Sequence, residues 1–272
     1  MKIGIIGLGF VGGSIEKSFK LLKIDTVVYD KFKNGGIGNI ENVLLCDIIF
    51  LALPTPYSNK LKKYNYEPIE ETLKILKNKN YSGICVIKST IQPEITYLLE
   101  NKYNLPLIHN PEFLTARTAF QDFHNQKHIV LGKGKLVTEN QYNLIKQFYQ
   151  SHYPKADISE CSALESESMK IFCNSFYALK VQFFTELYLV SQKNNSDYNK
   201  IKNMMIKNNW INPMHTDVPG HDGSLSYGGL CFPKDTNALQ KYMESLNSPN
   251  LILESCIKER NQMRKDNDNI EL

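Results

Sequence analysis

A glycine-rich turn between an apolar run and a helical pattern opens the chain, in KIGIIGLGFVGGSIEKSFKLL. Residues 2–6 indicate a short buried strand, and a helix is expected from near Phe10. Gly7, Gly9 and Gly12 have the spacing GxGxxG: the first glycine allows a tight turn, the second lets the backbone approach a pyrophosphate, and the third lets the helix pack on the strand. The unpaired N–H groups at the helix start favour negative charge there, so this stretch predicts a dinucleotide site.

A second strand, TVVYD, ends in Asp30, 18 residues after Gly12. This spacing is close to the roughly 20 residues expected for a carboxylate that binds the adenosine ribose 2′-OH. Asp30 therefore favours NAD over NADP, although Lys31 and Lys33 leave room for a 2′-phosphate. A glycine turn that binds no ligand is the alternative interpretation.

Strands and helices continue to alternate through the first half of the chain. CDIIFLALPTP, GICVIKST, LPLIHNPEF and KHIVLG indicate strands, whereas EPIEETLKILKN and QPEITYLLENKY indicate helices. This pattern predicts an α/β fold with a doubly wound parallel sheet of the Rossmann type, whose ligands bind at the carboxyl ends of the strands. The strand-end residues that could line one cleft are Pro54, Thr55, Lys88, Ser89, Thr90 and Glu112.

The second half of the chain is predicted to be helical. A pattern without Pro or Gly runs from Ser162 to about Ser191, and its part FYALKVQFFTELYLV is apolar nearly all round. Such a helix is expected to be buried on several sides, which suggests the core of a homodimer. We expect an NAD-binding domain over residues 1–158 and a smaller all-helical domain, built on this long central helix, over residues 159–272.

Three polar residues share one face of the long helix. Glu167, Lys170 and Asn174 follow the spacing i, i+3, i+7. They could form a solvated stripe, or the lysine and asparagine could stabilise an oxyanion in a cleft.

The stretch SYGGLCFPKD, residues 226–235, places Cys231 between two glycines and a proline. This cysteine is either a small buried apolar residue or a reactive thiol. The cysteines form no CxxC pair, and reduced thiols in the cytosol are the expectation. No metal site is expected, because the pair His124 and His128 lacks a helical apolar face and a third ligand.

Composition and charge limit the classes of partner to be expected. A formal charge of +4 spread along 272 residues gives no reason to expect nucleic acid, and no apolar run approaches the ~18 residues of a membrane-spanning helix. The start of the chain has no secretory signal pattern. A soluble cytoplasmic protein is therefore expected.

Seven motifs occur in one order along the chain: GLGFVG, YD, LPTP, IKST, NPEFL, ExxKxxxN and GGLCFPKD. In this order the chain resembles the UDP-glucose/GDP-mannose dehydrogenases, most closely the UDP-glucose 6-dehydrogenase branch. The resemblance extends from residue 1 to about residue 265. It implies that two NAD+ oxidise the C6 alcohol of a nucleotide sugar, by default UDP-glucose, to the carboxylate. It also implies that Cys231 is the nucleophile that holds the aldehyde as a thiohemiacetal and then as a thioester.

Further catalytic roles follow from the same resemblance. Lys170 and Asn174 would stabilise charge on the C6 oxygen, Asp235 would position water and Lys170, Glu112 would be the acid or base in thioester hydrolysis, and Thr90 would hold water. The expected cofactor contacts are Gly7, Gly9, Phe10, Val11, Gly12, Asp30, Pro54, Thr55, Ser89, Thr90 and Lys234. The expected substrate contacts are Glu112, Phe113, Leu114, Lys170, Asn174, Tyr227, Gly228 and Gly229.

The chain also departs from the family pattern. Ala116 stands where a second glutamate is usual, and Thr185 replaces an asparagine. The chain stops after SPNLILESCIKERNQMRK and a charged tail, so we expect a short form without the C-terminal UDP-binding domain. Two alternatives stay open: a degenerate nucleotide-sugar-binding protein that needs a partner chain, and a two-electron dehydrogenase of the β-hydroxyacid type. The GGLCFPKD stretch speaks against the second.

Overall fold

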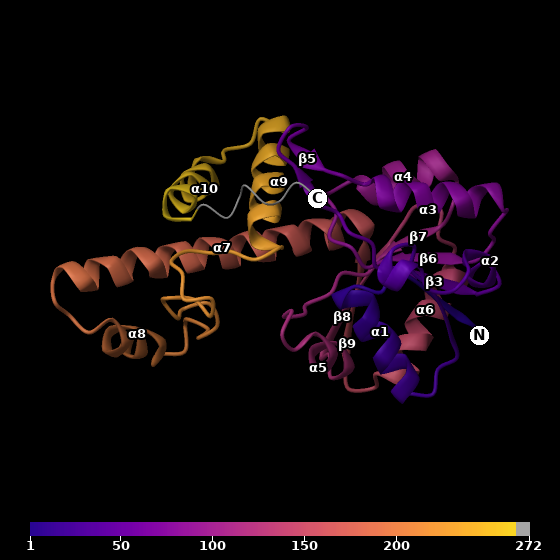
Figure 1. Ribbon diagram of the computed structural model, residues 1–272, viewed down its shortest axis with the longest axis horizontal. Helices are drawn as coiled ribbons and strands as arrows, with labels where there is room; N and C mark the ends of the chain where they lie inside the picture. The colour runs from indigo at the N-terminus through magenta and orange to yellow at the C-terminus, as the bar shows by residue number, and fades with distance from the viewer. Residues whose placement is uncertain (265–272) are drawn as a thin grey trace. The chain divides into compact units, whose positions relative to one another are not determined.

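A computed structural model describes residues 1–264 of the chain (Figure 1). The chain divides into two compact units. The first consists of Met1–Thr55 and Asn65–Lys170, and the second of Pro56–Tyr64 and the chain from Ile171 onward.

The first unit is built on a seven-stranded sheet with the strand order β2-β1-β3-β6-β7-β8-β9. The pairing is parallel except between β7 and β8, which confirms the predicted doubly wound sheet. The sheet changes direction at β1, because β2 lies on one side of it and β3 on the other, and such a switch point is where ligands bind in this kind of sheet. The strands are β1 Ile3–Ile6, β2 Thr26–Tyr29, β3 Ile48–Leu51, β6 Ile84–Ile87, β7 Leu107–His109, β8 His128–Lys133 and β9 Asp157–Ser162.

Apolar residues cover both faces of this sheet, as the continuous apolar runs predict. In β3, Ile48 and Phe50 belong to the core shared with α1, α5 and α6, whereas Ile49 and Leu51 belong to the core shared with α3 and α4. Figure 1 shows these helices around the sheet. The alternation follows from the two-residue period of a strand. The helices are α1 Phe10–Leu21, α2 Ile40–Val43, α3 Glu67–Asn78, α4 Ile95–Tyr103, α5 Ala119–His124 and α6 Glu139–His152, and Lys33–Gly35 forms a 3₁₀ turn.

The second unit is mainly helical, but it also contains a hairpin from the first half of the sequence. The long helix α7, Ala163–Lys193, continues into this unit, which also holds α8 Tyr198–Ile206, α9 Phe232–Ser245 and α10 Leu251–Met263. The hairpin strands β4 Tyr57–Ser58 and β5 Lys63–Tyr64 both contact α9. Periodicity did not predict the hairpin, because each of its strands has two residues.

In the single chain, α7 is buried on one side and exposed on another. Phe172, Phe176, Phe183 and Val190 are each more than half exposed. They recur at intervals of four and seven residues, so they form one stripe along the helix. The opposite side of the helix is buried, with Ala178 among the buried residues.

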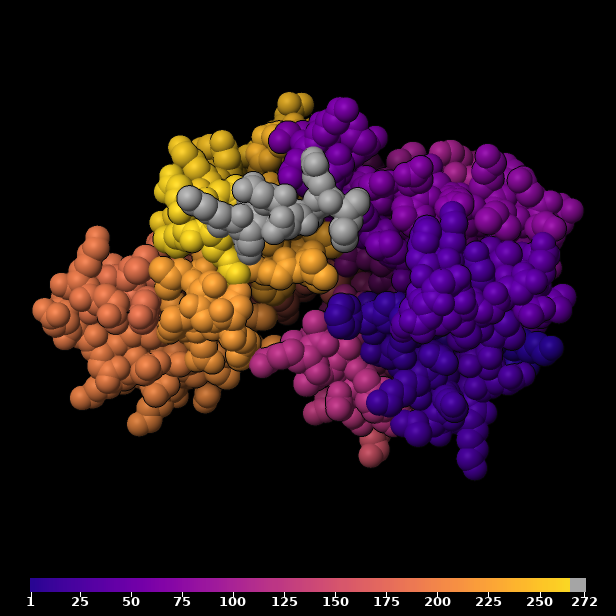
Figure 2. Space-filling view, in the orientation of Figure 1, coloured from indigo at the N-terminus to yellow at the C-terminus, as the bar shows by residue number. Residues whose placement is uncertain are grey.

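The part of the second unit near the end of α7 is formed by α8 and the loop that follows it, in orange at the surface in Figure 2. Tyr198 at the start of α8 is buried, and its hydroxyl donates to the Thr216 carbonyl in this loop at 2.6 Å. Among residues 1–264, no helix has the combination of length and apolar character that crossing a membrane requires.

Candidate active site

The glycine turn after β1 is shaped by close packing. Gly7 has φ +89°, and a Cβ atom there would lie 2.4 Å from the Ala52 carbonyl oxygen. A Cβ atom on Gly12 would lie 1.8 Å from the Gly7 oxygen, so α1 approaches the turn as closely as it does because this position has no side chain. Gly9 caps α1 and has open space around its Cα. An open backbone at a helix N-terminus fits the pyrophosphate of NAD.

Asp30 at the end of β2 is tied to this turn. Its Oδ2 accepts from Leu8 N at 2.7 Å, and its Oδ1 accepts from the backbone N–H groups of Phe32 and Lys33 at 2.9 and 2.8 Å. Partial burial acts to raise the pKa of the Asp30 carboxyl, but these three donors outweigh it and hold the pKa below the usual value. An ionised carboxylate has about four acceptor positions, so one remains for a ribose hydroxyl.

The ends of β3 and β6 are joined by hydroxyl groups. Ser89 Oγ donates to Leu53 O at 2.6 Å and accepts from Leu53 N at 3.1 Å. Thr55 Oγ1 donates to Thr90 O at 2.8 Å. The predicted residues Thr55, Ser89 and Thr90 therefore form one edge of the sheet, with Pro54 between Leu53 and Thr55 in the sequence.

Glu112 and Lys170 form a largely buried pair in the first unit. Lys170 Nζ lies 3.3 Å from Glu112 Oε1 and donates to the Glu112 carbonyl oxygen at 2.5 Å. The other carboxylate oxygen accepts from Leu114 N at 2.6 Å, and the Phe113 ring lies 5.3 Å from the ammonium. This places the four predicted residues of the NPEFL turn and α7 in one cluster.

Lys88 is buried close to this pair. It is 1% exposed, and its ammonium donates to Asn110 Oδ1 at 2.8 Å. Burial lowers the pKa of Lys88 to about 7, the charge of Glu112 acts to raise it, and the charge of Lys170 lowers it further. The charges of Glu112 and Lys170 therefore act on the protonation of Lys88.

Glu167 has a structural role and is not part of a solvated stripe, which was one of the two interpretations of its spacing with Lys170 and Asn174. It is fully buried, and its carboxylate accepts from Glu94 N and Thr96 N at 2.7 Å each. These two donors lie at the start of α4, so Glu167 caps that helix. Burial raises the pKa of Glu167 to about 7 against the effect of these hydrogen bonds.

The GGLCFPKD stretch forms the start of α9 in the second unit. Cys231 is the N-cap residue and is exposed, and Pro233 lies in the first turn. The positive end of a helix stabilises a negatively charged sulfur, so this is a suitable place for a nucleophilic thiol. Gly229 has φ +77° and open space around its Cα, which leaves the backbone before the cysteine accessible.

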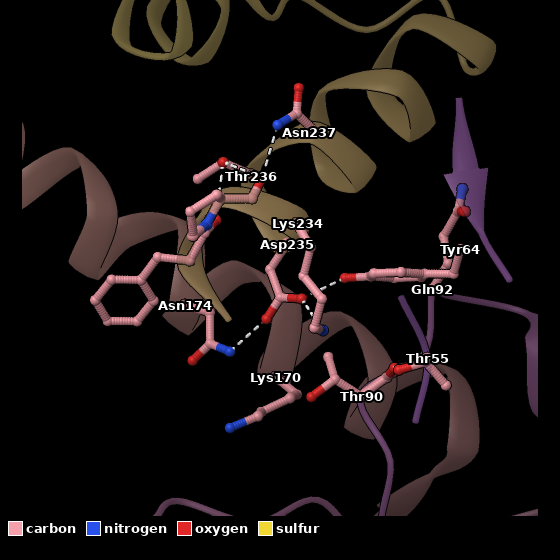
Figure 3. A network of polar contacts seen from close by, with 12 residues as sticks. Thr55, Tyr64, Thr90, Gln92, Lys170, Asn174, Lys234, Asp235, Thr236 and Asn237 are labelled. Atoms are coloured by element: carbon pink, nitrogen blue, oxygen red, sulfur yellow. Dashed lines mark hydrogen bonds and ion pairs between the residues drawn. The ribbon is translucent and has the colours of Figure 1, made fainter. Parts of the chain in front are cut away.

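Asp235 and Asn174 meet in the same unit. Asp235 is fully buried, and its Oδ2 accepts from Asn174 Nδ2 at 2.6 Å (Figure 3). Its Oδ1 accepts from Lys234 Nζ and from Tyr64 Oη, each at 2.5 Å. Lys234, predicted as a cofactor contact, is thus paired with Asp235. Tyr64 was missed, because nothing in the sequence connects two positions 171 residues apart.

The loop before the cysteine is held by α10. Arg260 Nε donates to Tyr227 O at 3.0 Å, and Arg264 Nη1 donates to Ser226 O at 3.1 Å. A Cβ atom on Gly228 would lie 2.4 Å from the Arg264 guanidinium. The Tyr227 side chain is buried, and its carbonyl oxygen already accepts from Arg260.

Two domain models of one protein family match the chain. Residues 36–152 match the model of the NAD-binding domain of the UDP-glucose/GDP-mannose dehydrogenase family, and residues 164–262 match that of its central domain. A UDP-glucose 6-dehydrogenase of Campylobacter jejuni is 27% identical over 97% of this chain and 73% of its own length. One from Bacillus subtilis is 29% identical over 97% of this chain and 67% of its own length.

Solved structures show the same fold. A UDP-glucose dehydrogenase from Pyrobaculum islandicum superposes with a TM-score of 0.84 and 22% identity, over 96% of this chain and 68% of that one. A UDP-D-ManNAc dehydrogenase from Pyrococcus horikoshii gives a TM-score of 0.78 and 19% identity, over 97% of this chain and 69% of that one. The chain thus spans about 70% of the length of these relatives.

Proposed function

Because the chain belongs to the UDP-glucose/GDP-mannose dehydrogenase family, we propose that it oxidises the C6 alcohol of a nucleotide sugar to the carboxylate through a covalent adduct on Cys231. The family and the relatives indicate an NAD-dependent nucleotide-sugar dehydrogenase. UDP-glucose is the default substrate, since the two curated relatives described above are UDP-glucose 6-dehydrogenases. Each NAD+ supplies a hydride acceptor, so two are reduced per sugar.

The observation that carries the proposal is the position of Cys231 at the N-terminus of α9, one turn before the Asp235–Asn174 contact. After the first oxidation, the sulfur would add to the aldehyde carbon, and the resulting oxygen would take a proton, giving a thiohemiacetal. The second oxidation would convert this adduct to a thioester. Attack of water on the thioester would release the carboxylate and return the thiol. A covalent adduct keeps the aldehyde from escaping between the two oxidations.

The roles of the other residues are part of the proposal. Lys170 and Asn174, four residues apart on α7, would stabilise negative charge on the C6 oxygen. Glu112 would accept a proton from the attacking water, supported by its contact with Lys170. Thr90 would hold that water. Asp235 would position Asn174, with which it shares a hydrogen bond.

A homodimer is the assembly we propose. The exposed stripe of α7, defined as Phe172, Phe176, Phe183 and Val190, consists of four apolar side chains on one side of the helix. Burying a side chain of this size is worth about 1.5–3 kcal/mol relative to leaving it in water. A second copy of the chain, offering the same stripe across a two-fold axis, would cover it.

The activity is tested by incubating the protein with NAD+ and a panel of UDP-, GDP- and TDP-sugars, following the absorbance of reduced nicotinamide. Two NADH per sugar are expected. Cys231→Ala should block uronate formation, whereas Cys161→Ala, which changes a half-buried thiol in β9, should not. One NADH per sugar with Cys231 intact would overturn the four-electron reaction. If the wild type forms no NADH with any of these sugars, the proposed dehydrogenase activity is wrong.

A further inference from the structure

The β4–β5 hairpin delivers a tyrosine hydroxyl to the carboxylate of Asp235. Tyr64 Oη and Asp235 Oδ1 are 2.5 Å apart, and the two residues are 1% and 0% exposed (Figure 3). The hairpin lies against α9 and belongs to the same compact unit. A segment of the first half of the sequence therefore contributes to the carboxylate that follows Cys231 by one helical turn.

Tyr64 contacts both members of the ion pair between Lys234 and Asp235. Its hydroxyl donates to the carboxylate, and its ring lies 4.7 Å from the Lys234 ammonium, which itself pairs with Asp235. A buried carboxylate is stable only when its acceptor positions are filled, and hydrogen bonds to a charged group are about twice as strong as neutral ones. Tyr64 thus fixes both the carboxylate and the cation beside it.

The orientation of Asn174 follows from that of Asp235. An ionised carboxylate only accepts, so Asn174 must turn its Nδ2 toward Asp235 Oδ2, at 2.6 Å. One N–H bond of Asn174 Nδ2 then points at Asp235, and this fixes the direction of the second N–H bond on the same nitrogen. A rotation of the carboxylate would rotate this amide with it.

We propose that Tyr64 is a positioning residue of the oxidation site, acting through Asp235 on Asn174. This inference rests on the proposed function, in which Asn174 stabilises charge on the C6 oxygen. It assigns to the hairpin a part in catalysis that neither its length nor its place in the sequence indicates. Tyr64 itself does not need to contact the substrate.

The test is Tyr64→Phe, which removes one oxygen atom and keeps the ring over Lys234. We expect kcat to fall about tenfold to a hundredfold, as for the loss of a hydrogen bond to a charged group, while KM for the sugar and for NAD+ stays within about twofold. The matched control is Tyr57→Phe, because Tyr57 is on the same hairpin and packs edge-on against Tyr64, with ring centroids 6.3 Å apart. An equal loss in both variants would mean a structural effect of the hairpin and would overturn the inference.

A double-mutant cycle with Asn174→Ala shows whether Tyr64 acts through this amide. If it does, Tyr64→Phe has little further effect on kcat in the Asn174→Ala background, whereas fully multiplicative losses would overturn the inference. The same cycle in urea unfolding needs no activity. If the wild type oxidises no sugar, the proposed function fails. Coupling in the unfolding cycle would then still support the Tyr64–Asp235–Asn174 contact, and its absence would overturn the inference as well.

Discussion

The ammonium of Lys170 lies 3.3 Å from the Glu112 carboxylate, and it also donates a hydrogen bond to the Glu112 carbonyl oxygen at 2.5 Å. The double contact ties α7 to the turn after β7. It gives Glu112 a fixed cationic neighbour, while Leu114 N holds the second carboxylate oxygen at 2.6 Å. In the proposed reaction, a carboxylate held in this way would take its proton from one direction.

Glu112→Gln is expected to slow thioester hydrolysis more than either oxidation. The amide keeps the shape of the side chain but cannot accept a proton, and loss of a general base costs about a hundredfold to ten-thousandfold. Rapid mixing should show a burst of NADH followed by slow turnover, and intact mass spectrometry should find the sugar on Cys231. Glu71→Gln, at an exposed ion pair with Lys31, is the control. A uniform loss without an adduct would contradict the role.

Lys88 predicts how stability depends on pH. Its pKa falls from 10.5 to about 7 in the folded chain, so between these values the unfolded state binds the extra proton. The contribution of Lys88 to the free energy of unfolding therefore rises with pH from about 7, by up to about 1.4 kcal/mol per unit, and is least favourable below pH 7. Lys88→Met should remove this slope in urea unfolding between pH 6 and 9.

The charges that act on Lys88 are those of Glu112 and Lys170. Burial lowers the pKa of the neighbouring His109, and the charge of Lys88 lowers it further. Lys74→Met, at an exposed position of α3, should keep the slope of the wild type. An unchanged slope in Lys88→Met would show that another group carries it.

Local requirements made much of the first unit predictable. Gly7 and Gly12 stand where a Cβ atom would collide with backbone, and the buried strands show themselves as apolar runs. The sequence order of these elements then determines which strand ends meet. β9 was not predicted, because its residues DISECS are half exposed at the sheet edge and have no apolar run.

Contacts between distant segments were not predictable in this way. Helical spacing placed Glu167 beside Lys170, but it could not show that the carboxylate caps α4. The partners of Asp235 that are distant in the sequence come from α7 and from a two-residue strand, and no periodic pattern connects them. The apolar character of α7 was evident, whereas which of its sides the same chain covers depends on the packing of α9 and α10.

Asp30 is expected to contribute to the binding of NAD+. In Asp30→Asn, an NH₂ group takes the place of one of the two carboxylate oxygens. That oxygen accepts either from Leu8 N or from Phe32 N and Lys33 N, and an NH₂ group cannot accept from them. Affinity for NAD+ should fall about tenfold or more, with kcat at saturation nearly unchanged. Titration of the intrinsic fluorescence with NAD+ and NADP+ measures both affinities. The control is Asp25→Asn, just before β2, and equal binding of NAD+ by Asp30→Asn and the wild type would exclude the ribose contact.

The stripe on α7 predicts the oligomeric state. The wild type should sediment as a dimer, and Phe176→Glu, at a side chain 61% exposed in the single chain, should yield monomers because a charge cannot be buried in an apolar interface without a partner. Phe32→Glu places the same charge at a phenylalanine 79% exposed in the first unit, away from α7 in the sequence, and should remain dimeric. Sedimentation velocity over a range of concentrations distinguishes the two. A monomeric wild type, or a Phe176→Glu variant that is still dimeric, would show that this stripe is not the interface.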